Sequence, residues 1–228
     1  MLKMIENIRS EFSKKDDFSQ EQLDDVFQEI KQYKDRLMPN ENDEQLVLVN
    51  SLGNRTDLHA PRWMCHLLDI RHLCVHVLIR WKTPQFSQVF VFQIRSWKKF
   101  DSPGQIDISV GGHVTDAMET EKAALKEMEE EIGLLKNDLI NSRIIHCTSY
   151  EKYDENVKNN FYNREWREVY VGDISTQSLE SIKFNDNEVV GLYLCPQNEL
   201  SQLLTQKTIP IASGLRSTLP YFIQCPTV

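Results

Sequence analysis

The most informative residues of this chain are 111–114 (GGHV) and, after a short loop, 123–134 (AALKEMEEEIGL). Glu127, Glu130 and Glu131 stand at positions i, i+3 and i+4, so on a helix they cover about 100° of one side. Three carboxylates held this close repel one another, and a multivalent cation between them would offset that repulsion. The spacing therefore predicts a helix whose acidic face binds a cation.

The same helix carries an apolar stripe beside its acidic face: Ala124, Leu125, Met128 and Ile132. At the helical period these side chains share one side, so we expect them to anchor the helix to a core, while Lys122, Lys126 and Glu129 face solvent. Gly133 stands where a left-handed cap costs least, and we expect the helix to end there.

An isolated Glu-x-x-Glu-Glu is more often an ordinary solvated helix face. Here an apolar strand at 106–110 leads into the paired glycines before the anchored acidic helix, and this context favours the cation site. The arrangement resembles the Nudix box of diphosphate hydrolases, G-x5-E-x7-R-E-U-x-E-E-x-G-U, where U is apolar. Counted from Gly112, two positions depart: Met118 replaces the first Glu, with Glu119 one step late, and Lys126 replaces Arg.

In the family those two positions form a salt bridge that braces loop against helix, so the resemblance implies an altered brace and a retained metal site. It implies metal ligands at Glu127, Glu130, Glu131 and the carbonyl oxygen of Gly112. These hard oxygen ligands favour Mg²⁺ or Mn²⁺ over zinc. A metal-activated water would then attack the diphosphate.

We expect the catalytic residues to be Glu130, Glu131 and a general base outside the box. Glu168 is the first candidate for this base and Glu188 the second; either one is as readily a solvated glutamate at the end of a strand. The resemblance places phosphate contacts in the loop ahead of the box, at Arg95, Lys98 and Lys99. Loop lysines are equally often just solvated, and the neighbouring Trp97 and Phe100 either stack on a ring or cover a core edge.

Within the superfamily, residues 46–204 look closest to the branch that contains isopentenyl diphosphate isomerase. Isomerisation requires a cysteine where Gly111 stands and a glutamate where Trp166 stands. The sequence therefore favours a pyrophosphohydrolase acting on a nucleoside diphosphate linked to another group, or on a related organic diphosphate. A residual isomerase and a non-catalytic module that binds a diphosphate ligand are the alternatives.

A second group of potential metal ligands precedes the box: Cys65, His66, His72 and Cys74. His66, His72 and His113 match metal histidines of the isomerases. The spacing C-H-x5-H-x-C fits no standard zinc template, however, and small buried thiols are common in strands. We therefore expect a structural role for this group. The five cysteines are odd in number, scattered and without a CxxC pair, so we expect reduced thiols.

Composition excludes several classes of function. The net charge of −8 argues against a partner of duplex nucleic acid. The start of the chain has no secretory pattern and no run is long enough to span a membrane, so we expect a cytoplasmic protein with a small-molecule diphosphate substrate.

We predict an α/β (α+β) fold of the Nudix type, an α/β/α sandwich with a mixed sheet, plus an amphipathic helical segment at the amino terminus. The predicted divisions are a helical appendage at 1–45, a Nudix domain at 46–205 and a tail at 206–228. A helix over 20–37 is expected from a 3.6-residue period after a Ser19–Gln22 capping box, and a homodimer through this helix is consistent with its amphipathic pattern. Loops at 51–74 and 148–166 are expected to set specificity.

Overall fold

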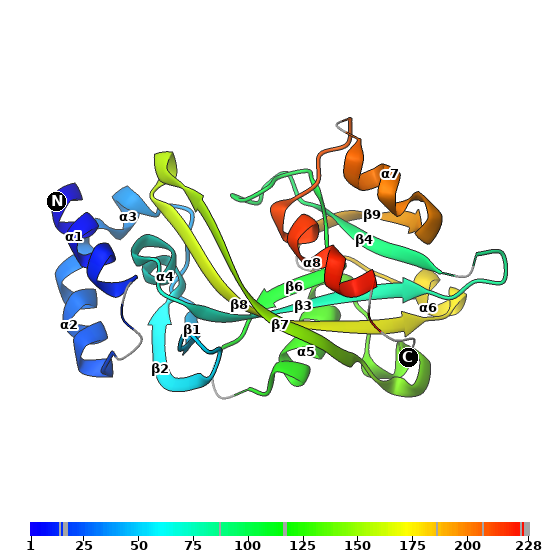
Figure 1. Ribbon diagram of the computed structural model, residues 1–228, viewed down its shortest axis with the longest axis horizontal. Coiled ribbons are helices and arrows are strands. Elements are labelled where there is room, and N and C mark those ends of the chain that lie inside the picture. The colour runs from blue at the N-terminus through cyan, green and yellow to red at the C-terminus, as the bar shows by residue number, and fades with distance from the viewer. Residues whose placement is uncertain are drawn as a thin grey trace. The chain divides into compact units, whose positions relative to one another are not determined.

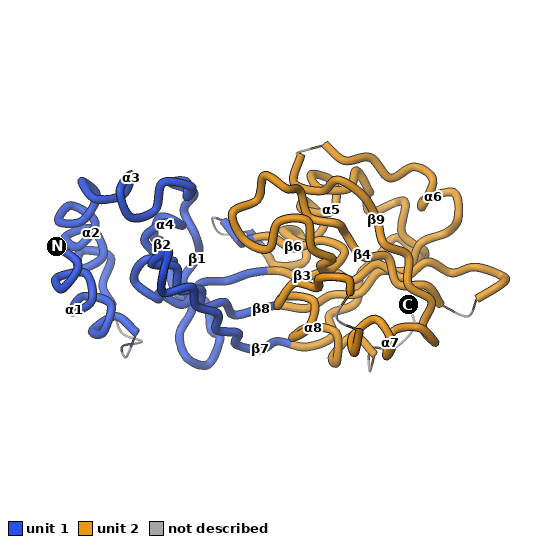
Figure 2. The backbone as a smooth tube through the Cα atoms, turned by 90° about the horizontal axis from the view of Figure 1, so that it is seen from above, with its two compact units in different colours: residues 1–74, 113–118, 149–167 blue, residues 75–112, 119–148, 168–228 orange. Residues whose placement is uncertain are grey.

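A computed structural model describes residues 1–13, 15, 18–86, 88–115, 118–185, 187–206, 208–223 and 225. The chain divides into two compact units (Figure 2). Unit 1 contains Met1–Cys74, His113–Met118 and Ser149–Arg167, and unit 2 contains Val75–Gly112, Glu119–Thr148 and Glu168–Val228.

Unit 1 begins with helices that pack on a hairpin and a further helix (Figure 1). Its elements are α1 (Leu2–Phe12), α2 (Gln20–Ile30), a 3-10 turn (Lys31–Tyr33), α3 (Lys34–Leu37), β1 (Gln45–Val49), β2 (Arg55–Pro61) and α4 (Arg62–Leu68). The capping box of α2 is confirmed, because Ser19 accepts from the backbone of Gln22 and Gln22 from that of Ser19. The helix predicted over 20–37 is interrupted by the 3-10 turn.

The remaining strands are β3 (His72–Trp81), β4 (Val89–Arg95), β5 (Ile106–Asp107), β6 (Val110–His113), β7 (Ile145–Asn156), β8 (Phe161–Ile174) and β9 (Val189–Pro196). The remaining helices are α5 (Thr120–Ile132), α6 (Thr176–Ser181), α7 (Leu200–Thr205) and α8 (Ser213–Ile223), with 3-10 turns at Lys136–Asp138, Ile140–Ser142, Val157–Asn159 and Gln197–Glu199. In unit 2, β4 pairs antiparallel with β3, β5 and β9. The mixed α+β fold with amino-terminal helices is confirmed.

The strand predicted at 106–110 is broken in two. The reason is Ser109, whose hydroxyl accepts from the backbone nitrogen of Ile79 (2.8 Å) and donates to the carbonyl of Val91. The Ser109 hydroxyl thus takes the place of backbone hydrogen bonds between strands. On either side of it, β5 pairs with β4 and β6 pairs with β3. The paired glycines therefore lie inside β6, not after a strand.

The two predicted specificity loops are also corrected. Residues 51–74 contain β2 and α4, and residues 148–166 lie mostly in β7 and β8, which pair with each other. In β8 the alternating side chains of Phe161, Glu165 and Arg167 are buried. Because a strand is normally recognised in a sequence by alternating apolar residues, the polar residues at these buried positions prevent its prediction.

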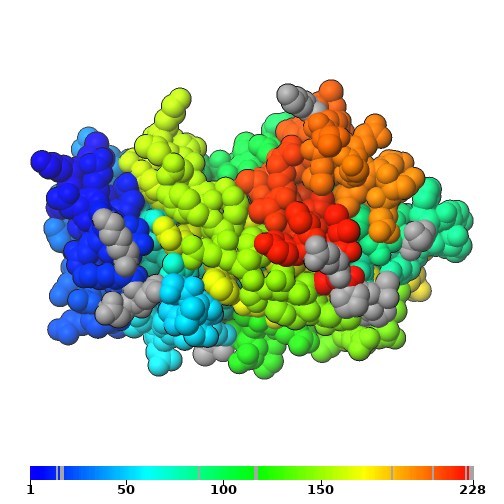
Figure 3. Space-filling model, viewed as in Figure 1, coloured from blue at the N-terminus to red at the C-terminus, as the bar shows by residue number. Residues whose placement is uncertain are grey.

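The carboxyl-terminal part of unit 2 contains α8, which lies beside α7 (Figure 3). The Arg216 guanidinium donates to the carbonyl of Leu204 at 3.1 Å. The predicted divisions at 45/46 and 205/206 stay predictions, and residues 207, 224 and 226–228 of the predicted tail lie outside the described residues. In the described part of the chain, no helix has the length and apolar character needed to span a membrane.

The prediction of reduced thiols is wrong for two of the five cysteines. Cys147 and Cys225 form a disulfide across 78 residues of sequence, with Cα atoms 5.7 Å apart. Cys65, Cys74 and Cys195 are buried and are not disulfide-bonded. Sequence spacing does not reveal this pairing, because Cys147 of β7 and Cys225 come together only when the unit folds.

A buried ion pair holds β3 to β8 within unit 2. The Arg80 Nε atom lies 2.6 Å from Asp173 Oδ1, and both side chains are 1% exposed. We expect Asp173→Ala to lower the free energy of unfolding by about 3–5 kcal/mol, because it leaves a buried guanidinium uncompensated. The exposed pair of Glu11 and Lys15 offers the control, since Glu11→Ala should cost less than about 1 kcal/mol. Equal losses in chemical denaturation would contradict this assignment.

Candidate functional site

Helix α5 forms as the sequence predicts. Ala124, Met128 and Ile132 are buried, whereas Lys122, Lys126 and Glu129 are exposed. Gly133 caps the helix in the left-handed conformation, with φ of 69°. The apolar stripe therefore fixes the rotation of α5, and that rotation determines where its glutamates point.

Glu127 lies directly against Gly112 of β6. A Cβ atom built on Gly112 would stand 2.2 Å from the carboxyl carbon of Glu127 and 2.5 Å from each of its oxygens. Such an atom cannot coexist with the carboxylate in this position. The two residues that the sequence predicts as metal ligands on separate elements are thus brought together, because residue 112 has no side chain.

Glu131 is buried, with 3% of its surface exposed, and it faces strand β4. Its Oε2 atom accepts a hydrogen bond from Gln93 Nε2 at 3.2 Å. Sequence reasoning missed Gln93 as a partner of the acidic helix. The signal was present as a lone amide in the apolar run of β4, since a buried polar side chain in a strand requires a partner.

Glu130 is at the surface, with a half-exposed side chain that lies 2.9 Å from the ammonium of Lys126. Lys126 occupies the arginine position of the family pattern, and here it pairs along its own helix. In unit 1, the carbonyl of Met118 accepts from Arg55 at 2.6 Å. Of the three glutamates, Glu127 and Glu131 are thus seated against other elements of unit 2, while Glu130 extends from the surface of the helix.

The candidate base Glu168 is paired with a histidine. His146 Nε2 lies 2.7 Å from Glu168 Oε2. Two residues further along β8, Tyr170 Oη lies 2.6 Å from Thr120 Oγ1 of α5. Residues i and i+2 share one face of a strand, so Glu168 lies on the face of β8 that meets α5. Thr120 and Glu127 are two turns apart, or about 10 Å along the helix.

The three predicted phosphate contacts lie in or beside the loop between β4 and β5. Arg95 donates from Nη1 to Asp107 (3.0 Å) and from Nε and Nη2 to the carbonyl of Asp101 (3.2 and 3.0 Å). Lys99 forms an ion pair with Glu188, the second candidate base. Lys98 is exposed. Arg95 and Lys99 therefore hold the loop in place, whereas Lys98 extends toward solvent.

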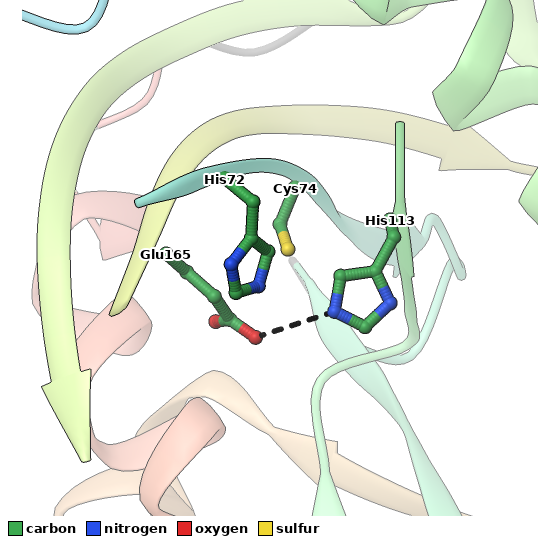
Figure 4. Close-up of side chains that lie close together, drawn as sticks. All are labelled: His72, Cys74, His113 and Glu165. Carbon is green, nitrogen blue, oxygen red and sulfur yellow. Dashed lines mark ion pairs between the residues drawn. The ribbon is translucent and has the colours of Figure 1, made fainter. Parts of the chain in front are cut away.

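Two members of the second group, for which the sequence predicts a structural role, lie in a compact cluster of potential metal ligands within unit 1. His72 and Cys74 of β3, His113 of β6 and Glu165 of β8 point toward one another (Figure 4). One ligand atom from each lies within 4.8 Å of the others. This cluster could hold a metal ion. Glu165, which the sequence reasoning missed, replaces the predicted Cys65, whose thiol donates to the carbonyl of Ala60.

The imidazoles of the cluster are arranged as metal ligands usually are. His72 Nδ1 lies 2.9 Å from the carbonyl oxygen of Ile70, which can only accept, so Nδ1 carries the proton and Nε2 has a lone pair. The Nε2 atoms of His66, His72 and His113 are buried and have no hydrogen-bond partner among the described residues. Buried polar atoms normally have partners, so these orphans indicate a missing ligand.

Burial favours the neutral forms of the two imidazoles and of the thiol in this cluster. Desolvation lowers the pKa of His72 to about 4 and, together with the charge of Arg62, lowers the pKa of His113 well below its usual value. Desolvation also raises the pKa of the Cys74 thiol, and the carboxylate of Glu165 raises it further. Neutral imidazoles are the form that binds metals.

The comparisons with known proteins agree with the sequence resemblance. The profile of the NUDIX domain matches residues 71–216, more than half of the chain. The chain therefore belongs to the NUDIX domain family. Nudix hydrolase 3 of Arabidopsis thaliana is 28% identical over 167 residues, which are 72% of this chain. The chain spans about a fifth of that relative's length (21%).

Solved structures share the fold at low identity. DR0079 from Deinococcus radiodurans has a TM-score of 0.57 and 18% identity, covering 78% of this chain and 99% of its own. The NUDIX domain of NrtR from Shewanella oneidensis, solved in complex with ADP ribose, has a TM-score of 0.50 and 14% identity, covering 67% and 86%. The branch that contains the isomerases stays a prediction.

The contact between Gly112 and Glu127 gives a matched pair of variants. Gly112→Ala should fold, because the carboxylate at the end of a flexible side chain can move away. The diphosphate hydrolysis proposed below should fall by roughly 100-fold in this variant, since a displacement of about 1 Å at a reacting centre costs that much. Gly191→Ala in β9 is the control, because its Cβ would meet Ile94 at an ordinary 3.4 Å. Full activity of Gly112→Ala in a phosphate-release assay would contradict the assignment.

Proposed function

We propose that this protein is a Mg²⁺-dependent pyrophosphohydrolase that cleaves a nucleoside diphosphate linked to another group, or a related organic diphosphate. The observation that carries this proposal is the seating of two carboxylates, Glu127 on the backbone of Gly112 and Glu131 in the interior against Gln93. Acidic side chains on a merely solvated helix face would extend into water. Membership of the NUDIX domain family supports the same activity.

The residues fit a hard divalent cation. Glu127, Glu130, Glu131 and the carbonyl oxygen of Gly112 would supply oxygen ligands, which Mg²⁺ and Mn²⁺ prefer. When bound, the ion neutralises phosphate charge and lowers the pKa of water. The retention of Glu130 at the helix surface fits this set, because the link to Lys126 is a weak exposed pair that a ligand can replace.

The chain's own groups have separate tasks in this proposal. Gln93 orients the Glu131 carboxylate by donating to one oxygen, so the other oxygen keeps its direction. Glu168 accepts the proton of the attacking water, and His146 holds the Glu168 carboxylate in place. Lys98 supplies a positive charge to the phosphates at the exposed side of the loop.

Two observations bear on the alternatives. Position 111, where isomerisation needs a cysteine, is a glycine whose Cβ atom would lie 2.9 Å from Cδ1 of Ile108, so the packing there is built around the missing side chain. The pairing of Glu168 with His146 disfavours a non-catalytic module, because a binding module needs no oriented base. A cytoplasmic location and a homodimer stay predictions.

The metal ligand at the centre of the proposal is tested by Glu131→Gln. We expect this variant to keep the fold and to lose at least about 100-fold of Mg²⁺-dependent turnover, because even a partner of a metal ligand contributes 10- to 100-fold. Glu129→Gln, on the exposed side of the same helix, should be unchanged. Phosphate release from a panel of diphosphates is the assay. Unchanged turnover in Glu131→Gln would refute the proposed metal site.

We also propose that the cluster of unit 1 binds Zn²⁺ through His72, Cys74, His113 and Glu165. Two imidazoles, a thiolate and a carboxylate are a donor set typical of zinc, in contrast to the all-oxygen set of α5. Ligand atoms 2.0–2.3 Å from a tetrahedral ion stand roughly 3.3–3.8 Å apart, so atoms within 4.8 Å need to close by about 1 Å. The Nε2 atom of His72 has no hydrogen-bond partner among the described residues, and His113 Nε2 lies 4.0 Å from Oε1 of Glu165 across the same cluster (Figure 4); both support this proposal.

Elemental analysis of protein purified without chelator tests this second site. We expect about one zinc per chain in the native protein and a large loss in Cys74→Ser, because the thiolate is the strongest zinc donor of the set. The control is Cys195→Ser, which removes a buried thiol from unit 2 instead and should keep the metal. Absence of transition metal from the native protein, after dialysis against zinc and desalting, would exclude the site.

A further inference from the structure

We propose that Trp97 is a stacking platform that selects substrates carrying an aromatic base. This inference rests on the proposed function of unit 2, and it names a specificity residue that the family pattern of the box does not include. Trp97 lies in the loop between β4 and β5 and is 76% exposed, which is rare for the largest apolar side chain. An exposed tryptophan with a fixed orientation indicates a binding surface.

The indole is held on one face by the backbone of Gly104. A Cβ atom built on Gly104 would stand 2.4 Å from both Cη2 and Cζ3 of Trp97 and 2.7 Å from Cε3. Three consecutive ring atoms at these distances mean that the six-membered ring lies over the glycine. Gly104 has φ of +69° and no side chain, so it both makes the turn and leaves room for the ring. The opposite face of the indole is therefore the one open to solvent.

The loop beneath the indole is cross-linked. The backbone nitrogen of Gly104 donates to the carbonyl of Arg95 at 3.2 Å, and that of Lys99 donates to Ser96 at 3.2 Å. The backbone nitrogen of Ser96 also donates to the carbonyl of Glu188 at 2.7 Å. These bonds, with the Arg95 side chain on Asp101, fix the backbone on both sides of Trp97. A preorganised ring loses little entropy when a base stacks on it.

The platform is connected to the acidic helix by one strand. Gln93, which holds Glu131, and Arg95, which begins the loop, are alternate residues of β4 and point to the same face. Trp97 follows two residues later in a turn, so four residues separate it from Gln93 and the two Cα atoms stand at most roughly 13 Å apart. A ligand whose diphosphate lies at the glutamates thus has its remaining part within reach of the indole.

Stacking of a base on an aromatic side chain stabilises complexes by about 1–3 kcal/mol, which corresponds to about 5- to 140-fold in affinity. We expect Trp97→Ala to raise KM for ADP-ribose by this factor with little change in kcat, because stacking is equal in the ground and transition states. Hydrolysis of phosphoribosyl pyrophosphate, a diphosphate without a base, should be unaffected. Trp97→Phe keeps a ring and should retain most of the affinity.

Fluorescence separates this inference from the proposed function. Titration of AMP should quench the native emission, ribose 5-phosphate should not, and the quenching should be lost in Trp97→Phe but kept in Trp81→Phe. This readout needs no turnover, so it holds even if no tested diphosphate is hydrolysed. Equal KM changes for both substrates in Trp97→Ala, or AMP quenching that survives in Trp97→Phe, would overturn the platform.

Discussion

The close approach of the Glu127 carboxylate to the backbone of Gly112 is the contact on which the candidate site depends. It joins α5 to β6, and it exists because residue 112 has no Cβ atom. The apolar stripe of α5 sets the rotation of the helix, so the direction of Glu127 follows from the packing of the adjacent face. The Glu127 carboxylate is thus oriented by two features that carry no charge: the absence of a side chain at Gly112 and the buried apolar stripe of α5.

Strand β4 relates the acidic helix to the loop that follows. Its interior amide, Gln93, donates to Glu131, and Arg95 on the same face bonds Asp107 and Asp101. Buried polar groups cost free energy unless they are paired. Each of these pairs therefore satisfies a polar side chain of β4 and also holds its partner in a defined position. The same strand therefore links the candidate metal site on α5 to the loop that contains Trp97.

The two candidate metal centres differ in chemistry. The carboxylates of unit 2 are hard oxygen donors, partly open to solvent, whereas the cluster of unit 1 has nitrogen, sulfur and oxygen donors in a buried pocket. Desolvation keeps the imidazoles of His72 and His113 neutral by lowering their pKa values. Each environment thus favours a different class of ion.

The sequence alone determined the acidic helix, its cap at Gly133 and its apolar stripe, because these features depend on local period and on a single glycine. It also indicated the family, since the box is a local pattern. Tertiary structure decided which side chains meet: Gln93 with Glu131, His146 with Glu168, Glu165 with the histidines, and Cys147 with Cys225. These partners come from segments far apart in the chain, and β8 with its buried polar residues does not show the alternation that identifies strands. Local periodicity specifies an element and its faces, but contacts between elements depend on packing that no single segment contains.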